Sequence, residues 1–204
     1  MNRNILEYLK RIQAMAKTGL TYTENPYDIE RYEEMRDMTN ELLAQLSNAP
    51  LESIQFHFDH LDEDYPTPKV DVRGVVLKEG RILLIQEKTD QKWAMPGGWC
   101  DIGYSASENV AKEVFEEAGL IVKPIRILSV WDKAKQDHPH GIRYVYKINF
   151  LCEVVSGDLN VGHEALDGGF FALDELPPLS EVRNTERQIH KLVELAKSGE
   201  IEWD

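Results

Sequence analysis

The segment "PGGWCDIGYSASENVAKEVFEEAGL", residues 96–120, constrains the fold more than any other part of the sequence. It opens on a proline and two glycines and continues into a stretch rich in glutamate. Ser105 followed by Glu108 is a capping-box pattern, which predicts a helix over about 106–118. Gly119 then ends the helix, as a C′ glycine commonly does. The segment therefore predicts a glycine loop directly before a short acidic helix.

Three glutamates lie close together on this helix: Glu113, Glu116 and Glu117. Positions 113 and 117 face the same way, and 116 is the i+3 neighbour of 113. Two carboxylates about 4 Å apart repel by roughly 4 kcal/mol at an effective dielectric constant near 20. Mg²⁺ offsets such repulsion because it takes carboxylate oxygens together with substrate phosphates. Glycines let the backbone approach, so a carbonyl oxygen of Gly97 or Gly98 is a further candidate ligand. The alternative is a solvated acidic face, which is common on helices.

Helical patterns precede this segment and strand patterns surround it. Apolar residues recur at three- and four-residue steps over 5–16 and 29–46, and Asn25 followed by Pro26 is a helix start signal. The strand-like stretches that follow are VDVRGVVL, RILLIQE, LIVKPIRILSVWD, RYVYKINFLCEVV and GGFFAL. A final helix, with Ile189 and Leu192 inward, closes the chain. This order predicts an α+β fold, a sandwich with an added N-terminal helical lobe.

The same patterns predict three parts. Residues 1–60 form a helical extension, the acidic, proline-containing residues 61–69 form a linker, and residues 70–204 form the domain that carries the acidic helix. A helix pair of this size cannot bury its apolar faces alone. The extension is therefore expected to form a homodimer, to form one wall of a substrate pocket, or to do both.

Charge and composition exclude several classes of partner. The formal net charge is −13, from 23 basic and 36 acidic residues, which repels polyanions. The sequence lacks the basic face of a duplex-DNA binder and any apolar run long enough to cross a bilayer. Its N-terminus lacks the features of a secretion signal. Cys100 and Cys152 are best interpreted as reduced thiols, and together these features predict a cytoplasmic protein.

The framing of the acidic helix resembles the Nudix box, the signature of nucleoside diphosphate-X hydrolases, at Gly98, Glu113, Val114, Glu116, Glu117, Gly119 and Leu120. Residues 70–180 resemble a whole Nudix domain. "VWDKAKQDHPHG" and "YKINFLCE" resemble a bacterial subgroup with an N-terminal helical extension. Two positions depart from the family pattern, since Tyr104 stands where Glu is usual and Lys112 where Arg is usual. Lysine supplies the charge but not a planar two-pronged donor, which affects efficiency and loop geometry.

The resemblance implies an α/β/α sandwich with a mixed sheet and metal-dependent hydrolysis of the pyrophosphate bond of a nucleoside diphosphate derivative. Within the subgroup, the similarity favours CDP-choline, cleaved to CMP and phosphocholine, over ADP-ribose. The implied ligands of Mg²⁺ or Mn²⁺ are Glu113 and Glu117 with the carbonyl of Gly97 or Gly98. Glu116 is implied to hold a second metal or a metal-bound water.

The resemblance also implies a catalytic base outside the box. Glu164, in a loop before a strand, is the first candidate and Asp167 the second, although a solvated loop acid is an equal alternative for both. Candidate substrate contacts are the aromatic residues Trp131 and Tyr104, for stacking on a base, and the basic residues Arg73 and His138, for a phosphate. The alternatives are core packing for Trp131, a surface ion pair for Arg73 and a solvated position for His138.

Two other functions fit the sequence less well. An RNA end resembles the substrate chemically, but the charge of −13 argues against high affinity for long RNA. A non-catalytic Nudix-type sensor is expected to lose box glutamates and to gain a basic lobe, and neither change is present here.

Overall fold

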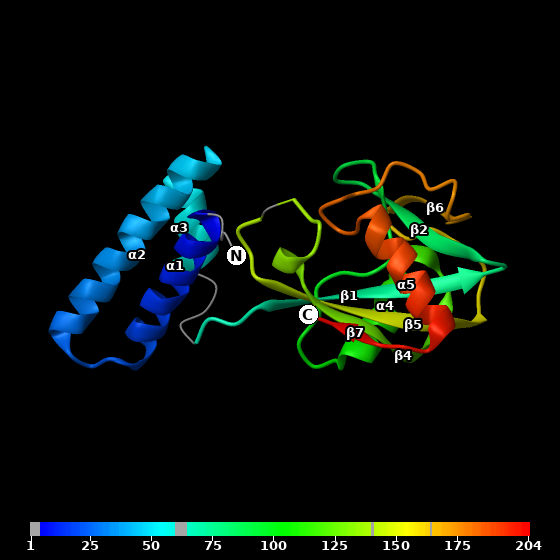
Figure 1. Cartoon of the computed structure of the whole chain (residues 1–204), viewed down its shortest axis with the longest axis horizontal. Helices are drawn as coiled ribbons and strands as arrows, with labels where there is room; N and C mark the ends of the chain where they lie inside the picture. Colours follow the sequence, from blue (N-terminus) through cyan, green and yellow to red (C-terminus); the bar gives the residue numbers. More distant parts are fainter. Residues whose placement is uncertain (1–4, 60–64, 140, 164) are drawn as a thin grey trace. The chain divides into compact units, whose positions relative to one another are not determined.

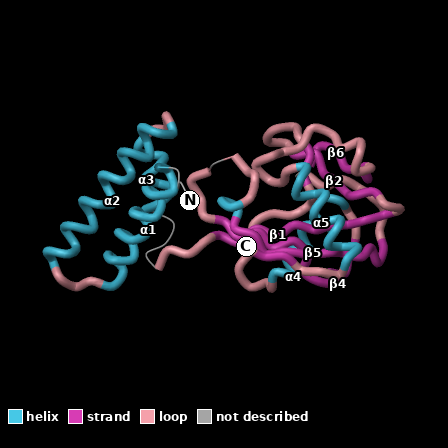
Figure 2. Tube along the Cα trace, in the orientation of Figure 1, coloured by secondary structure: helices cyan, strands magenta, loops and turns pink. Residues whose placement is uncertain are grey.

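The computed structural model of the chain describes residues 5–59, 65–139, 141–163 and 165–204. It divides into two compact units, Met1–Thr67 and Pro68–Asp204. The first is helical, and all the described strands belong to the second (Figure 1; Figure 2). The expected α+β class is confirmed. Of the predicted linker, 61–69, residues 61–64 lie outside the described residues, and the first strand already begins at Lys69.

The N-terminal unit contains three helices in the part of it that the structure describes: α1 (Ile5–Tyr22), α2 (Pro26–Ser47) and α3 (Leu51–Asp59). Asn25 caps α2 through its side chain, and Pro26 occupies the first turn, as the start signal predicts. Each helix contributes one side chain to a small buried core, namely Leu9, Leu43 and Ile54. The third helix is additional to the two helical patterns visible in the sequence, and its Ile54 helps to bury the apolar faces of the first two.

The second unit is a mixed sheet with a helix on each face. Its elements are β1 (Lys69–Lys78), β2 (Arg81–Glu87), β3 (Trp93–Ala94), α4 (Ala106–Ala118), β4 (Ile121–Asp132), η1 (Lys133–Lys135), β5 (Val145–Ser156), β6 (Ala165–Phe171), α5 (Glu186–Ser198) and β7 (Glu202–Trp203). In the described residues the strand order is β3-β2-β1-β5-β4-β7, and β6 pairs with β2. β1 runs parallel to β5 and β4 parallel to β7, whereas the remaining neighbours are antiparallel.

Alternation along β1 separates two cores. Val72 and Val76 belong to the core that includes Val114 of α4. Val75, on the opposite face, belongs to the core that includes Ile189 of α5. The sheet therefore lies between α4 and α5, as Figure 1 shows. Among the described helices, none is both long and apolar enough to span a membrane.

Candidate active site

Local signals fix the acidic helix as the sequence predicts. The Ser105 side chain accepts a hydrogen bond from the Glu108 amide at 3.3 Å, and Glu108 Oε2 accepts one from the Ser105 amide at 2.8 Å. Gly119 ends α4 with φ 71° and donates to the Phe115 carbonyl. The predicted capping box and C-cap are both confirmed, and the three glutamates lie in the last two turns of the helix.

The glycine loop before α4 is held on the edge of β1. Val72 N donates to the Gly98 carbonyl at 2.9 Å, and Gly74 N donates to the Pro96 carbonyl at 2.8 Å. Gly97 lies between them with φ +139°, and a Cβ atom there would be 2.0 Å from the Val72 carbonyl oxygen, so only glycine fits. In the described part of the chain, no hydrogen bond ends on the Gly97 carbonyl oxygen, which is therefore open to another ligand.

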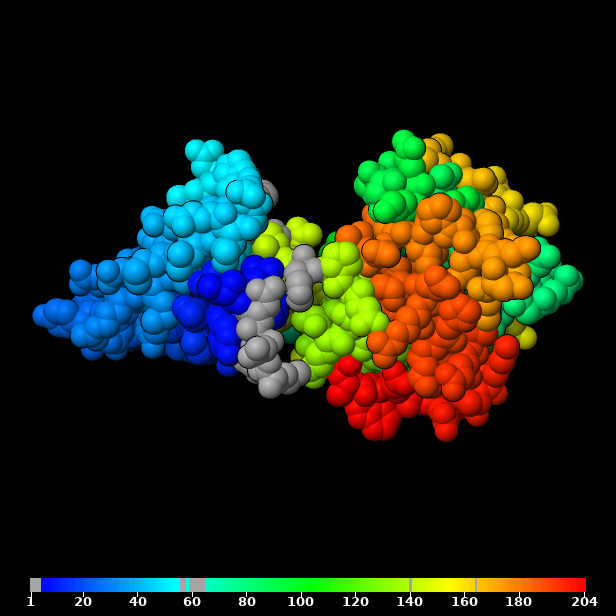
Figure 3. Space-filling view, turned by 45° about the horizontal axis from the view of Figure 1, so that its top comes forward, coloured from blue at the N-terminus to red at the C-terminus, as the bar shows by residue number. Residues whose placement is uncertain are grey.

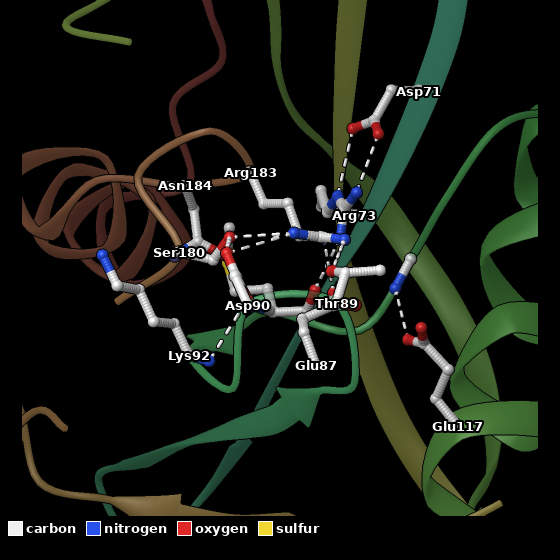
Figure 4. Close-up of polar contacts among 12 residues, drawn as sticks. Asp71, Arg73, Glu87, Thr89, Asp90, Lys92, Glu117, Ser180, Arg183 and Asn184 are labelled. Atoms are coloured by element: carbon white, nitrogen blue, oxygen red, sulfur yellow. Dashed lines mark hydrogen bonds and ion pairs between the residues drawn. The ribbon is translucent and has the colours of Figure 1, made fainter. Parts of the chain in front are cut away.

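Two of the glutamates reach this loop. Glu117 is 7% exposed, and its Oε2 accepts a hydrogen bond from the Gly97 amide at 2.8 Å. Figure 4 shows this contact. The Glu113 carboxylate lies against Gly98, since a Cβ atom at that glycine would be 3.1 Å from Glu113 Oε2. Two carboxylates and the open Gly97 carbonyl therefore meet at one place.

Glu116 points elsewhere. Its Oε2 pairs with Lys112 Nζ at 3.0 Å, and the same ammonium contacts Asp101 Oδ2 at 3.1 Å. The lysine thus bridges two separate carboxylates, and it contacts the middle glutamate as the arginine at this position is implied to do. No group of three or more His, Cys, Asp or Glu side chains that could hold a metal ion occurs within the described residues. Of the three glutamates, Glu113 and Glu117 are thus the ones that flank the glycine loop.

The electrostatics of Glu117 favour a cation. Burial raises the pKa of Glu117 to about 8, and the charges of Glu87 and Glu113 add to the rise, while Arg73 and the Gly97 amide oppose it. A carboxylate in such surroundings is stabilised in its charged form by a bound cation. The donors present, two carboxylates and a carbonyl oxygen, are those that Mg²⁺ and Mn²⁺ prefer. The residues here fit a divalent metal ion.

Arg73 is buried rather than open to a phosphate. It is 4% exposed, and its Nε and Nη2 atoms donate to the two Asp71 oxygens at 3.0 and 2.8 Å. Lys147 on β5 contacts Asp71 Oδ1 at 2.6 Å. Burial alone raises the pKa of Asp71, but the two cations hold it far below its usual range. The charged residues that alternate with valine in "VDVRGVV" are the sequence signal for this buried triad.

The other predicted site residues are buried in the core, exposed to solvent or outside the described residues. Trp131 is 2% exposed and packs in the core beneath α5, whereas Tyr104 is 54% exposed. The exposed Asp167 accepts a hydrogen bond from the Gly168 amide at 2.8 Å. Glu164 lies outside the described residues. The buried position of Trp131 matches the core-packing alternative stated for it, and its ring is not available to a base.

His138 is also structural. Its Nδ1 lies 2.7 Å from the Glu181 carbonyl oxygen, and its Nε2 lies 2.9 Å from Gln188 Nε2. A carbonyl can only accept, so Nδ1 carries the proton and Nε2 accepts from the glutamine amide. Burial lowers the pKa of His138 to about 4, and the Glu181 carbonyl opposes the shift. Lys147 and Lys133 lower it further, whereas Asp71 raises it.

We expect His138 to make the protein less stable in mild acid. The unfolded state takes up a proton at about pH 6.5 and the folded state only at about pH 4, so stability is lost as the pH falls through this window. The loss from this group is at most about 3 kcal/mol. The measurement is urea unfolding of the wild-type protein and of His138→Gln at several pH values. The difference between the two curves should shrink from pH 7 to pH 4, and parallel curves would contradict the assignment.

Sequence reasoning did not single out Lys133 and Arg143, and it considered Trp99 only as one of four aromatic residues that could stack on a base. Trp99 directly follows Gly98, is 47% exposed, and has the Arg143 guanidinium 5.9 Å from its ring centroid. The side chain of Lys133, half-buried in the β4–β5 connection, makes no hydrogen bond or ion pair in the described residues. Burial lowers the pKa of Lys133, and nearby positive charges lower it further, while Asp71 opposes the shift. In a chain of net charge −13, this local positive surface is the signal for an anionic ligand.

A polar network joins the end of β2 to the segment before α5. Arg183 pairs with Glu87 at 2.7 Å, and Ser180 Oγ donates to Asp90 Oδ2 at 2.7 Å. Asn184 Oδ1 accepts from the Met95 amide at 2.7 Å. Figure 4 shows these side chains, and Figure 3 shows the turn that contains Asp90 (green) beside the later segment (orange) at the surface.

Comparisons with known proteins identify the family. Residues 67–193 match the NUDIX domain. The chain belongs to the Nudix family. Residues 3–58 match a second Nudix-associated module, described as a UDP-X-like, N-terminal oligomerisation domain. The chain is a Nudix pyrophosphohydrolase that acts on nucleoside diphosphate derivatives, and Nudix hydrolases generally use divalent metal ions.

Relatives cover almost the whole length of this Nudix enzyme. A protein of Bacillus subtilis (strain 168), YjhB, named provisionally as an ADP-ribose pyrophosphatase, is 42% identical over 94% of this chain and 92% of its own. A crystal structure of an ADP-ribose pyrophosphatase from Streptococcus suis 89-1591 is 42% identical, with a TM-score of 0.61 over 67% of this chain and 98% of its own. A UDP-X diphosphatase structure is 35% identical, with a TM-score of 0.64 over 97% of this chain and 96% of its own.

Proposed function

We propose that this Nudix enzyme hydrolyses the pyrophosphate bond of a nucleoside diphosphate linked to a sugar, with ADP-ribose as the first candidate and UDP-linked compounds as the second. The observation that carries the proposal is the meeting of Glu113, Glu117 and the open Gly97 carbonyl at one place, directly before the exposed Trp99 and its neighbour Arg143. The first expectation, CDP-choline, finds no support in the names of the three relatives given above.

The proposed mechanism assigns separate tasks to the chain's residues. Glu113, Glu117 and the Gly97 carbonyl would hold Mg²⁺ or Mn²⁺, which would supply positive charge to offset that of the pyrophosphate. Glu116, paired with Lys112, would hold a second ion or a water molecule. Glu164 or Asp167 takes the proton of the attacking water. The loop before these two acids is fixed on the metal helix, since Gly162 N donates to the Glu117 carbonyl at 3.2 Å.

We propose that the substrate binds on the side of the glycine loop where Lys133 and Arg143 lie. Lys133 and Arg143 face the non-bridging phosphate oxygens, and the exposed Trp99 ring offers a surface on which the base or the sugar stacks. Tyr104, exposed beside the same loop, is a second aromatic candidate. Neither contact needs Trp131, which is occupied in the core.

The test is a panel of ADP-ribose, UDP-sugars and CDP-choline, each with Mg²⁺ and with Mn²⁺, read as phosphate release after coupling to a phosphatase. We expect ADP-ribose or a UDP-sugar to be turned over at least about tenfold faster, in kcat/KM, than CDP-choline. Chelation with EDTA should abolish turnover, and added metal should restore it, because the ligands are hard oxygen donors. Turnover that survives complete chelation, or a clear preference for CDP-choline, would overturn the proposal.

We also propose that the helical unit forms a homodimer. Met38, Leu42 and Leu46 of α2 are spaced four residues apart, so they lie on one face of the helix, and they are 53%, 46% and 50% exposed. The oligomerisation module matched by residues 3–58 supports self-association through this unit. A second copy of the same stripe would bury it.

The expected mass of the wild-type protein by light scattering is therefore twice the chain mass of 23.5 kDa. Leu42→Glu should shift the mass towards that of the single chain, since it places a charge in the apolar stripe. Glu41→Gln, a substitution at the exposed neighbouring position, should leave the mass unchanged. A wild-type mass equal to that of one chain would contradict the homodimer.

A further inference from the structure

The backbone of one residue next to the metal loop, Met95, is held through both its amide and its carbonyl group. Met95 directly precedes Pro96, Gly97 and Gly98. Its amide donates to Asn184 Oδ1 at 2.7 Å, and its carbonyl oxygen accepts from Arg73 Nη1 at 3.0 Å. Met95 is 1% exposed, Arg73 4% and Asn184 0%, so water does not compete for either hydrogen bond. Side chains from β1 and from the segment before α5 thus fix the two successive peptide planes that flank Met95.

Arg73 holds the carbonyl group of Met95 and is itself rigidly fixed. Two of its nitrogens bind the two Asp71 oxygens, and Asp71 is itself held by Lys147 at 2.6 Å. The guanidinium plane is therefore fixed, and Nη1 is aimed at the Met95 carbonyl. A lysine at this position keeps the positive charge but lacks a planar fork that can satisfy the aspartate and the carbonyl at once.

Asn184 holds the amide group of Met95, but in doing so leaves one of its own polar atoms without a hydrogen bond in the part of the chain that the structure describes. Its carboxamide oxygen faces the Met95 amide, so its Nδ2 points away and is buried without a hydrogen-bond partner in the described residues. The functional atom at this position is therefore the acceptor oxygen, which an aspartate also provides.

Met95, held by these two hydrogen bonds, precedes the proposed ligand Gly97 by two residues. The Gly97 amide binds Glu117 Oε2 and the Gly97 carbonyl is open. A site residue displaced by about 1 Å can lose two orders of magnitude in rate, so the position of this backbone matters. We propose that Arg73 and Asn184 are positioning residues of the metal site, which fix the two peptide units that flank Met95 and through them the Gly97 carbonyl and its contact with Glu117. The inference rests on the metal centre of the proposed function.

The test uses the full-length enzyme without substrate. Isothermal titration with Mn²⁺ gives the metal affinity, and amide hydrogen exchange of the metal-free protein reports the order of residues 95–98. Asn184→Ala and Arg73→Lys should each weaken Mn²⁺ binding by about tenfold or more and speed exchange at the Gly97 amide. Asn184→Asp, which keeps the acceptor, should recover most of the affinity lost in Asn184→Ala.

Ser180→Ala is the matched control. Ser180 is 0% exposed and lies in the same segment, but its hydroxyl binds Asp90 rather than Met95. This variant should lose thermal stability with less than about a threefold change in Mn²⁺ affinity. The inference is overturned by unchanged exchange at Gly97 or unchanged Mn²⁺ affinity in Asn184→Ala, or by an equal loss of affinity in Ser180→Ala. A wild-type enzyme that binds no Mn²⁺ overturns the proposed metal centre and this inference together.

Discussion

Glu117→Gln is expected to lower kcat/KM by at least about a hundredfold while leaving the fold intact. The glutamine keeps the size of the side chain and an oxygen that can accept the Gly97 amide, so the 2.8 Å contact has a neutral replacement. It removes the charge that a hard divalent cation requires from this ligand. The buried carboxylate also lies near the charges of Glu113 and Glu87, so its removal should not destabilise the metal-free protein.

The measurements are steady-state kinetics across a range of Mg²⁺ concentrations and thermal unfolding without metal. Glu194→Gln is the control, because Glu194 pairs with Lys191 at 3.3 Å on the exposed face of α5 and its loss should change neither quantity appreciably. If Glu117→Gln keeps more than about a tenth of the wild-type kcat/KM, the assignment of Glu117 as a metal ligand is wrong.

The parts of the fold that sequence predicts correctly depend on short-range chemistry. The helix Ala106–Ala118 is set by Ser105, Glu108 and Gly119, all within its own ends. The β1–β2 hairpin turns at Glu79 and Gly80, which have φ 52° and 77°. In each case the residues that determine the element lie within a few positions of it, so one sequence suffices.

The site depends on contacts between distant segments, which local patterns do not reveal. Met95 meets Asn184 across 89 positions and Arg73 across 22. Arg73 was expected at a phosphate or in a surface ion pair, but its pairing with Asp71 is buried, because both side chains project from one face of a strand that is covered by the rest of the unit. Trp131 and His138 are likewise buried rather than available to a substrate, because α5 covers both.

The glycine loop shows where sequence and structure support each other. Two consecutive glycines indicate close approach of the backbone, but not which carbonyl remains open. The register of the loop on β1 decides this, since the carbonyls of Pro96 and Gly98 accept hydrogen bonds from β1 and that of Gly97 does not. This register supports the Gly97 carbonyl as the proposed ligand, of the two that the sequence left as alternatives.

Gly97→Ala is expected to cost about 3 kcal/mol or more of unfolding free energy and to reduce kcat/KM by at least about a hundredfold. Two effects add at this position. The φ of +139° lies in a region that an L-residue rarely adopts, which costs about 1–3 kcal/mol. A Cβ atom would also lie 2.0 Å from the Val72 carbonyl oxygen, so the loop has to leave the edge of β1. The hydrogen bond to Glu117 and the open carbonyl would then move together.

Gly103→Ala separates the two effects. Gly103 has φ +94°, but nothing lies within 4 Å of its would-be Cβ atom, so an alanine there introduces backbone strain without a clash. Urea unfolding should show a loss of about 1 kcal/mol for Gly103→Ala and a clearly larger loss for Gly97→Ala. Only the latter should also abolish Mn²⁺ binding. Equal losses in the two variants would mean that the close approach to Val72 contributes nothing, and that the loop is free to supply its carbonyl from another position.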